Sequence, residues 1–66
     1  MYVYIGFPDK GSHAIRFCDT EKAMDDFKSK WESNYILELV FTTPAKFGEN
    51  RFYRAKVKKH VYGNKV

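Results

Sequence analysis

The chain has 66 residues, of which 44% are hydrophobic and 18% aromatic, and this composition can supply one small folded core without cross-links. Disordered chains combine low hydrophobicity with a high net charge. This chain has many hydrophobic residues and a formal net charge of only +4, so we expect it to fold. A lone cysteine, Cys18, excludes an internal disulfide and a cysteine-rich zinc site, and no apolar run or signal-peptide pattern indicates membrane insertion or export.

One cytoplasmic domain over residues 1–66 fits these limits, and its first predicted element is a β-hairpin. Residues 2–5 are β-branched or aromatic, as in a strand, and residues 8–12 are a cluster of turn formers. Residues 13–18 form the return strand. Gly11 supplies a left-handed conformation for a loop of about five residues between the two strands.

A helix is predicted next, beginning at residues 19–21. Asp19 and Thr20 offer side-chain oxygens for its N-cap, and Glu21 places a carboxylate in the first turn, where the helix dipole favours it. An apolar stripe indicates the side of the helix that packs on the sheet; its residues are Ala23, Met24, Phe27 and Trp31. The helix is expected to end near residues 33–34.

Two further strands follow the helix. Residues 35–43 alternate between two sides, and Pro44 removes a ladder donor and is expected to end that strand. A long strand is predicted from residue 51 to residue 62. The predicted fold class is therefore α+β: a two-layer β-β-α-β-β domain in which one helix packs on one face of a four-stranded, mainly antiparallel sheet.

One helix covers only one sheet face, so strand parity divides the side chains between a core and an open face. If the more apolar side of each strand faces the helix, the strand residues of the core are Val3, Ile5, Phe7, Ile15, Phe17, Leu37, Leu39, Phe41 and Val57. The open face then carries Tyr2, Tyr4, Arg16, Ile36, Val40, Phe52, Arg54, Lys56, Lys58, His60 and Tyr62.

Positive charge is concentrated in the C-terminal third of the chain. Residues 1–44 hold five Lys/Arg against seven Asp/Glu, whereas residues 45–66 hold seven against one. Cationic side chains track a phosphate backbone, and aromatic rings stack on unpaired bases. We therefore predict that the open face binds RNA or single-stranded DNA with low sequence specificity. The residues predicted for this site are Arg16, Phe52, Arg54, Lys56, Lys58, His60 and Tyr62.

Two other interpretations of the open face stand beside this one. Alternating Lys and Arg on an exposed strand also keeps a sheet soluble and prevents edge pairing. The face is also suited to a small adaptor or inhibitor that docks on an acidic partner protein or on a second copy of itself. The residues predicted for that contact are Tyr4, Trp31, Ile36 and Val40. In its length and its lack of enzyme motifs the chain resembles the short regulatory proteins that phages encode, which include polymerase and anti-CRISPR inhibitors.

No residue pattern indicates catalysis, a metal site or a cofactor. His13 and His60 lie on different predicted strands without a carboxylate at ligand spacing, and nothing pairs a nucleophile with a base. Cys18 precedes the helix, where a thiolate would be stabilised, yet a small buried or edge thiol is the simpler interpretation. Asp25 and Asp26 point about 100° apart around a helix and do not converge on one substrate. We expect a binding protein and not an enzyme.

Overall fold

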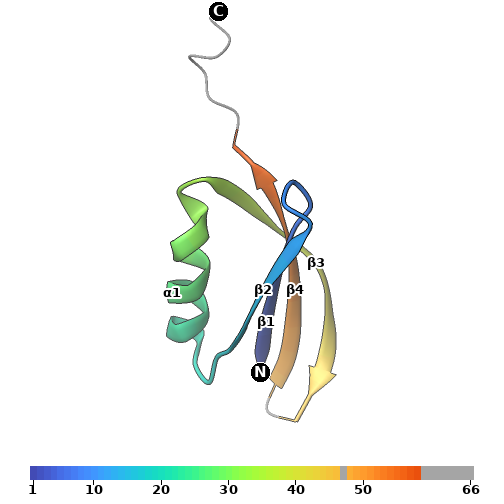
Figure 1. Cartoon of the computed structure of the whole chain (residues 1–66). Helices are drawn as coiled ribbons and strands as arrows, with labels where there is room; N and C mark the ends of the chain where they lie inside the picture. The colour runs from blue at the N-terminus through green and yellow to red at the C-terminus, as the bar shows by residue number, and fades with distance from the viewer. Residues whose placement is uncertain (47, 59–66) are drawn as a thin grey trace, which may run out of the picture.

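Four strands and one helix follow one another in the order β-β-α-β-β. The computed structural model describes residues 1–46 and 48–58. The elements are β1 (Tyr2–Phe7), β2 (Ser12–Phe17), α1 (Glu21–Glu32), β3 (Tyr35–Ala45) and β4 (Gly48–Val57). Figure 1 shows α1 on one side of the sheet, while no other described element covers the opposite side. The predicted two-layer α+β fold is confirmed.

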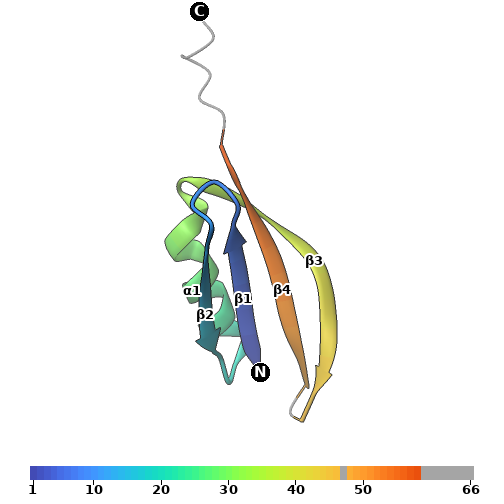
Figure 2. The ribbon, with the colours of Figure 1, turned by 45° about the vertical axis from the view of Figure 1, so that its right-hand side comes forward.

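The sheet is mixed, with one parallel strand pair at its centre. The strand order is β2-β1-β4-β3, in which β1 and β4 run parallel and both edge pairs run antiparallel (Figure 2). In the parallel pair Val3 lies beside Arg51 and Ile5 beside Tyr53. Because β1 has a neighbour on each side and a helix over it, Val3 and Ile5 are completely buried.

A short loop over residues 8–11 joins β1 to β2. The carbonyl oxygen of Phe7 accepts hydrogen bonds from the N–H groups of Lys10 (2.9 Å) and Gly11 (2.8 Å). Gly11 adopts φ +64°, in the left-handed region that glycine occupies without steric cost. The predicted hairpin is confirmed, and its tight closure sets Phe7 opposite Ser12.

The helix begins where the sequence predicts. The Thr20 hydroxyl accepts a hydrogen bond from the Ala23 N–H at 3.1 Å, which caps the first turn. Met24 and Phe27 are buried against the sheet, so the predicted apolar stripe is the inward face of α1. No helix among the described residues is long and apolar enough to span a membrane.

The core lies between α1 and the sheet face that α1 covers. Its buried members are Val3, Ile5, Phe7, Cys18, Met24, Phe27, Tyr35 and Ala55. Leu37 packs against them and is half-buried, as expected for the predicted core side of β3. The Tyr35 hydroxyl reaches the core boundary and donates a hydrogen bond to Asp9 Oδ2 at 3.2 Å. This bond ties the hairpin loop to the start of β3.

The prediction that Ile15 and Phe17 belong to the core is wrong. β2 pairs with β1 so that Arg16 lies opposite Val3, and directly opposed residues share one sheet face. Ile15 and Phe17 therefore lie on the open face, where they are 57% and 54% exposed. The reason is the closure of the hairpin loop, because a fixed register at the loop fixes the parity of the whole strand.

The prediction that Phe41 belongs to the core is also wrong. Leu39 pairs with Tyr53 and Phe41 with Phe52, so Val40 is an extra residue in β3, a β-bulge that reverses the parity beyond it. Phe41 consequently lies on the open face and is 52% exposed. Leu39 stays on the helix side but is 50% exposed, because α1 does not cover this part of the edge strand.

The ends of the last two strands differ from the prediction. β3 continues through Pro44 to Ala45, since an edge strand tolerates a residue without an N–H. β4 begins at Gly48 and ends at Val57, and the predicted continuation over residues 59–62 lies outside the described residues. Val57 faces the helix side, as predicted, opposite Tyr35, but it is exposed there rather than buried.

Candidate binding surface

Five aromatic side chains form a continuous row across the open face. We call this set the aromatic row; from β2 to β3 it consists of Phe17, Tyr2, Tyr4, Phe52 and Phe41. Successive ring centroids lie 5.3, 6.1, 4.2 and 4.3 Å apart. Each of the four strands contributes at least one ring, so the row depends on the assembled sheet.

The ring of Phe52 stands upright on the sheet between two others. Tyr4 on β1 and Phe41 on β3 flank it, with ring planes inclined by only 6° and 12°. The centroid spacings of 4.2 and 4.3 Å are close to the separation of neighbouring strands, about 4.8 Å. The ring normals therefore run from strand to strand. Solvent meets ring edges here, and both faces of Phe52 are covered.

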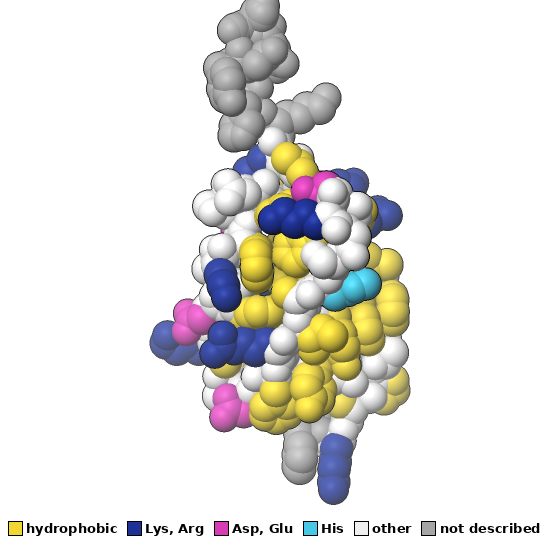
Figure 3. All heavy atoms as spheres, in the orientation of Figure 1, with side chains coloured by type: hydrophobic (Ala, Val, Ile, Leu, Met, Phe, Trp, Pro, Cys, Tyr) yellow, Lys and Arg dark blue, Asp and Glu magenta, His cyan; other side chains and the backbone are white. Residues whose placement is uncertain are grey.

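Aliphatic side chains widen the aromatic row into an apolar patch. Ile15 on β2, Ile36 on β3 and the bulge residue Val40 are each more than half exposed. Figure 3 shows hydrophobic side chains gathered over the side of the sheet away from α1. Large contiguous apolar patches are uncommon on monomeric soluble proteins and often mark sites of interaction, so this patch is a candidate binding surface.

Two cations lie beside the aromatic row and share one carboxylate. Arg54 Nη2 donates a hydrogen bond to Glu38 Oε1 at 2.9 Å, and Lys56 Nζ donates to Oε2 at 3.5 Å. The hydrogen bond from Arg54 and the nearby charge of Lys56 hold the pKa of Glu38 below its usual value. The cluster of Arg54, Lys56 and Glu38 thus carries one net positive charge instead of two. Its electrostatic field is therefore weaker than the sequence of β4 alone predicts.

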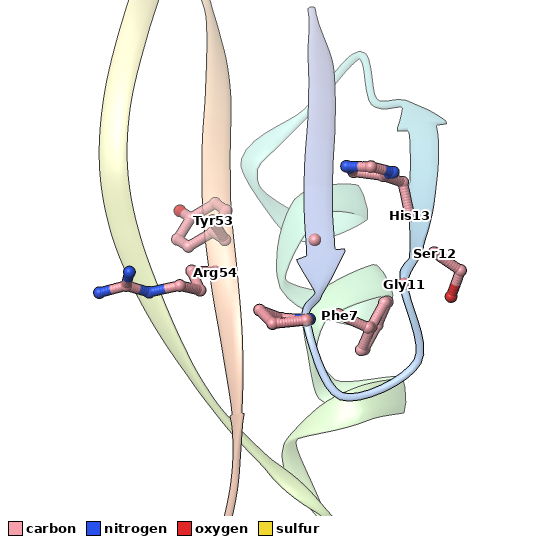
Figure 4. Close-up of a pocket in the computed structure, with 8 residues that line it drawn as sticks. Phe7, Gly11, Ser12, His13, Tyr53 and Arg54 are labelled. Atoms are coloured by element: carbon pink, nitrogen blue, oxygen red, sulfur yellow. The ribbon is translucent and has the colours of Figure 1, made fainter.

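A hollow of about 320 Å³ lies at the loop end of the open face. Gly6 lies between His13 on β2 and Arg54 on β4, its partners in register, and because Gly6 has no side chain the imidazole of His13 can extend over it. Figure 4 shows His13 directed over β1 and Arg54 directed away from β1 toward β3. The lining of the hollow is mainly apolar.

Part of the predicted nucleic-acid site comes together on the open face. Phe52, Arg54 and Lys56 share that face as predicted. Lys58 follows β4 directly and is exposed. The other two C-terminal positions of the predicted site lie outside the described residues; they are His60 and Tyr62.

The predicted placement of Arg16 on the open face is wrong. Arg16 lies opposite Val3 on the helix side of β2. Its guanidinium carbon is 5.9 Å from the centroid of the Phe27 ring, a cation–π geometry. The sheet separates Arg16 from Arg54 and Lys56, so the three cations cannot hold one ligand.

Three of the four residues predicted for a protein contact lie at the surface of β1 and β3. Tyr4 is part of the aromatic row, Ile36 lies beside Lys56 in the ladder, and Val40 is the bulge residue. Trp31 differs from them. Its ring centroid is 4.9 Å from that of Phe7, and its indole Nε1 is buried, so Trp31 packs the end of α1 against the core.

Sequence reasoning missed Phe17 and Phe41 as surface residues. Phe17 follows Ile15, and Phe41 follows Leu37 and Leu39, at intervals of two residues, so periodicity alone assigns both phenylalanines to the more apolar, inward side. The signal that identifies them is a cross-strand one: an open face that already carries Tyr4 and Phe52 offers further rings aromatic partners. Tyr2 was predicted on this face but not assigned to a site, and it joins Tyr4 to Phe17.

Cys18 is a packed core thiol, which confirms the simpler interpretation of this residue. Burial raises the pKa of its thiol, against the opposing effects of Arg16 and the N-terminal ammonium group. Within residues 1–46 and 48–58 no three His, Cys, Asp or Glu side chains are grouped as metal ligands.

Comparison with protein-family models, with curated proteins and with solved structures gives no match for this chain. The candidate surface therefore stands on its own geometry, which comprises the aromatic row, the hollow over Gly6 and the charge cluster centred on Glu38.

Proposed function

We propose that the chain is a small protein-binding module whose open sheet face docks on a partner protein that combines an apolar contact area with acidic side chains. The observation that supports this most directly is the coverage of Phe52 on both sides by Tyr4 and Phe41. A base-stacking platform needs free ring faces, whereas both faces of this central ring are covered by its neighbours. Rings held by their neighbours lose little conformational entropy on binding, which favours contact with an apolar protein surface.

The exposed apolar area of the open face supports a hydrophobic contact. Its members are about half-exposed; they are Tyr2, Ile15, Phe17, Ile36, Val40 and Phe41. A partner that covers them removes this area from water, and the free energy gained is roughly 25 cal/mol per Å² of apolar surface before the costs of association. Aromatic side chains near the centre of such an interface contribute most of its affinity.

Charge complementarity defines the rest of the partner surface. Arg54 and Lys56 share a single carboxylate, Glu38, so the cluster keeps a positive charge, and Lys58 extends it along the chain. A carboxylate of the partner would be attracted here, whereas a basic surface would be repelled. The hollow over Gly6 would receive an apolar side chain. The expected partner therefore carries an apolar anchor with acidic residues beside it.

A pull-down with matched variants tests this proposal. The immobilised chain is incubated with nuclease-treated lysate, and the proteins retained by the natural sequence are compared with those retained by Phe17→Ser and Gly6→Val. Both variants alter the open face, the first by removing a ring and the second by filling the hollow. The matched control is Val57→Ser, which truncates a similarly exposed side chain on the helix side of β4.

The retained partner is then purified, and its affinity is measured by calorimetry at low and high salt. We expect Phe17→Ser and Gly6→Val each to weaken binding about tenfold or more, with Val57→Ser close to the natural sequence. A partner that binds all four chains equally well would exclude the open face as its docking surface.

Binding of RNA or single-stranded DNA is the second candidate. It is supported by Arg54 and Lys56 on the open face and by the positive charge of residues 45–66. Material that is retained only without nuclease, with a log affinity that falls linearly against log salt, would favour this function over the first. Charge reversal at Lys56 and Lys58 would then abolish binding, while Phe17→Ser would change it little.

A further inference from the structure

Within residues 1–46 and 48–58, nothing covers or blocks the first half of β3, which is a sheet edge. β2 and β3 are the outer strands of the described sheet. The bulge at Val40 and the ring of Pro44 protect the second half of β3 against pairing with another strand. Residues 35–39 contain neither a bulge nor a proline, and Glu38 is the single charged residue among them.

Hydrogen bonding at the start of the β3–β4 ladder shows which backbone groups face this edge. The Lys58 N–H donates to the Asn34 carbonyl at 3.1 Å, so these two residues form a bonded pair. Bonded and non-bonded pairs alternate along an antiparallel ladder. The next pair, Tyr35 with Val57, is therefore non-bonded.

The same alternation continues to the bulge. Ile36 and Glu38 make the bonds to β4, because they follow Asn34 at intervals of two residues in an unbroken register. The N–H and C=O groups of residues 35, 37 and 39 consequently point away from β4. They form a short row of donors and acceptors along the outer edge of β3.

We propose that a second copy of this chain pairs with this edge in antiparallel orientation, with Leu37 opposite Leu37 of the second copy. This register uses all three outward-facing residues, because Tyr35 of each copy then lies opposite Leu39 of the other. A two-fold axis perpendicular to the sheet relates the copies. Two sheets of four strands become one sheet of eight, with both helices on the same face.

The apolar side chains on the helix side fit this pairing. Leu39 is half-exposed in one chain although it faces the side that α1 covers elsewhere. In the paired sheet it lies beside Tyr35 of the second copy, which is buried against the core of that copy. Leu37, which is half-buried in one chain, lies opposite Leu37 of the second copy. The contact thus covers the apolar surface that α1 leaves bare on the edge strand.

The charges on the open face fit a second copy as well. Glu38 lies opposite Ile36 of the second copy, and Lys56 of that copy follows in the same cross-strand row. No two like charges are directly opposed. The two Glu38 side chains occupy diagonal positions, and each is already bound by Arg54 and Lys56 of its own chain. This self-complementarity favours a second copy over an unrelated strand.

Sedimentation equilibrium over a range of concentrations tests the pairing. We expect the average mass to rise from one chain to two with concentration. Leu39→Lys adds a charge to the outer edge and should raise the dissociation constant about tenfold or more. Val57→Lys is the matched control, since it is equally exposed on the helix side but belongs to β4; it should dimerise like the natural sequence.

Amide hydrogen exchange locates the contact without any substitution. The N–H groups of Leu37 and Leu39 should exchange rapidly in dilute solution and become protected as the dimer forms. Phe17→Ser separates this contact from docking on the open face, because Phe17 lies on the opposite edge strand; the dimer should persist in that variant. A chain that stays monomeric up to about 1 mM, or a dimer that is lost in Phe17→Ser and kept in Leu39→Lys, would overturn the proposal.

Discussion

The ring of Phe52 lies parallel to the ring of Phe41, with centroids 4.3 Å apart and planes inclined by 12°. This contact depends on the bulge at Val40, which turns Phe41 from the helix side to the open face. A single extra residue in an edge strand thus decides which side chains complete the candidate binding surface.

The two phenylalanines should contribute unequally to stability. Phe52→Leu removes stacking with both Tyr4 and Phe41, whereas Phe41→Leu removes only one stacked pair. Since an aromatic pair contributes about 0.5–1.5 kcal/mol beyond its buried area, we expect Phe52→Leu to lower the free energy of unfolding by about 1–3 kcal/mol and Phe41→Leu by about half of that. Urea unfolding followed by circular dichroism measures both losses. Equal losses would show that the two contacts do not act as separate pairs.

Alanine at position 6 should stabilise the chain. A Cβ atom there would lie 3.6 Å from His13 Cδ2, an ordinary van der Waals distance, and Gly6 is not among the glycines with positive φ. Gly6→Ala restricts the unfolded chain and should raise the free energy of unfolding by about 0.4–1 kcal/mol. The matched control, Gly11→Ala, places a side chain at φ +64° and should lower it. Thermal unfolding ranks the three chains, and a reduced Tm for Gly6→Ala would contradict the expectation.

The carboxyl group of Glu38 should titrate at unusually low pH. The hydrogen bond from Arg54, with the charge of Lys56, lowers its pKa in the folded chain. The stability that this carboxylate contributes is therefore present above the pKa it has in the unfolded chain, and it is lost as the pH falls through the lowered value. Titration of the carboxyl carbon by NMR measures the midpoint. Arg54→Met should move that midpoint upward, and an unchanged midpoint in this variant would rule out the assigned cause.

Cys18 should react slowly with alkylating reagents. It is almost completely buried, and burial raises the pKa of its thiol, so both access and the thiolate fraction are reduced. Because the pKa is higher in the folded chain, the associated stability is fully present below the unfolded pKa and is lost as the pH rises through the folded value, in the alkaline range. Iodoacetamide labelling followed by mass spectrometry should be rapid in urea and slow in buffer. Similar rates in the two solutions would mean that Cys18 is accessible.

Elements fixed by neighbouring residues were predictable from the sequence. The hydroxyl of Thr20 and the apolar stripe of the helix act within a few residues, so the bounds and inward face of α1 follow from local rules. Gly11 marked the hairpin in the same way. On β4, simple alternation was enough to bring Phe52, Arg54 and Lys56 to one face.

Features that depend on contacts between strands were not predictable in this way. The parity of β2 is set by the closure of the hairpin loop, which moved Ile15 and Phe17 outward and Arg16 to the helix side. Both faces of the sheet carry apolar residues, so the more apolar side did not identify the core side of β2, although it did so for β1. The position of Phe41 required the bulge, and the pairing of β1 with β4 required knowledge of the strand order.

The central parallel pair has a consequence for how the chain matures during its synthesis. β1 is translated before the other described strands, yet one of its two sheet neighbours, β4, is the last of them. The Tyr2 N–H donates a hydrogen bond to Asn50 Oδ1 at 2.9 Å across a sequence separation of 48 residues. Until β4 leaves the ribosome, Val3 and Ile5 belong to a hairpin in which one edge of β1 has no strand paired with it. Pairing between strands that are far apart in the sequence is slow. The nascent chain therefore cannot complete its sheet stepwise from the N-terminus, and ribosome-bound chains halted before β4 should be recognised by chaperones as unfolded.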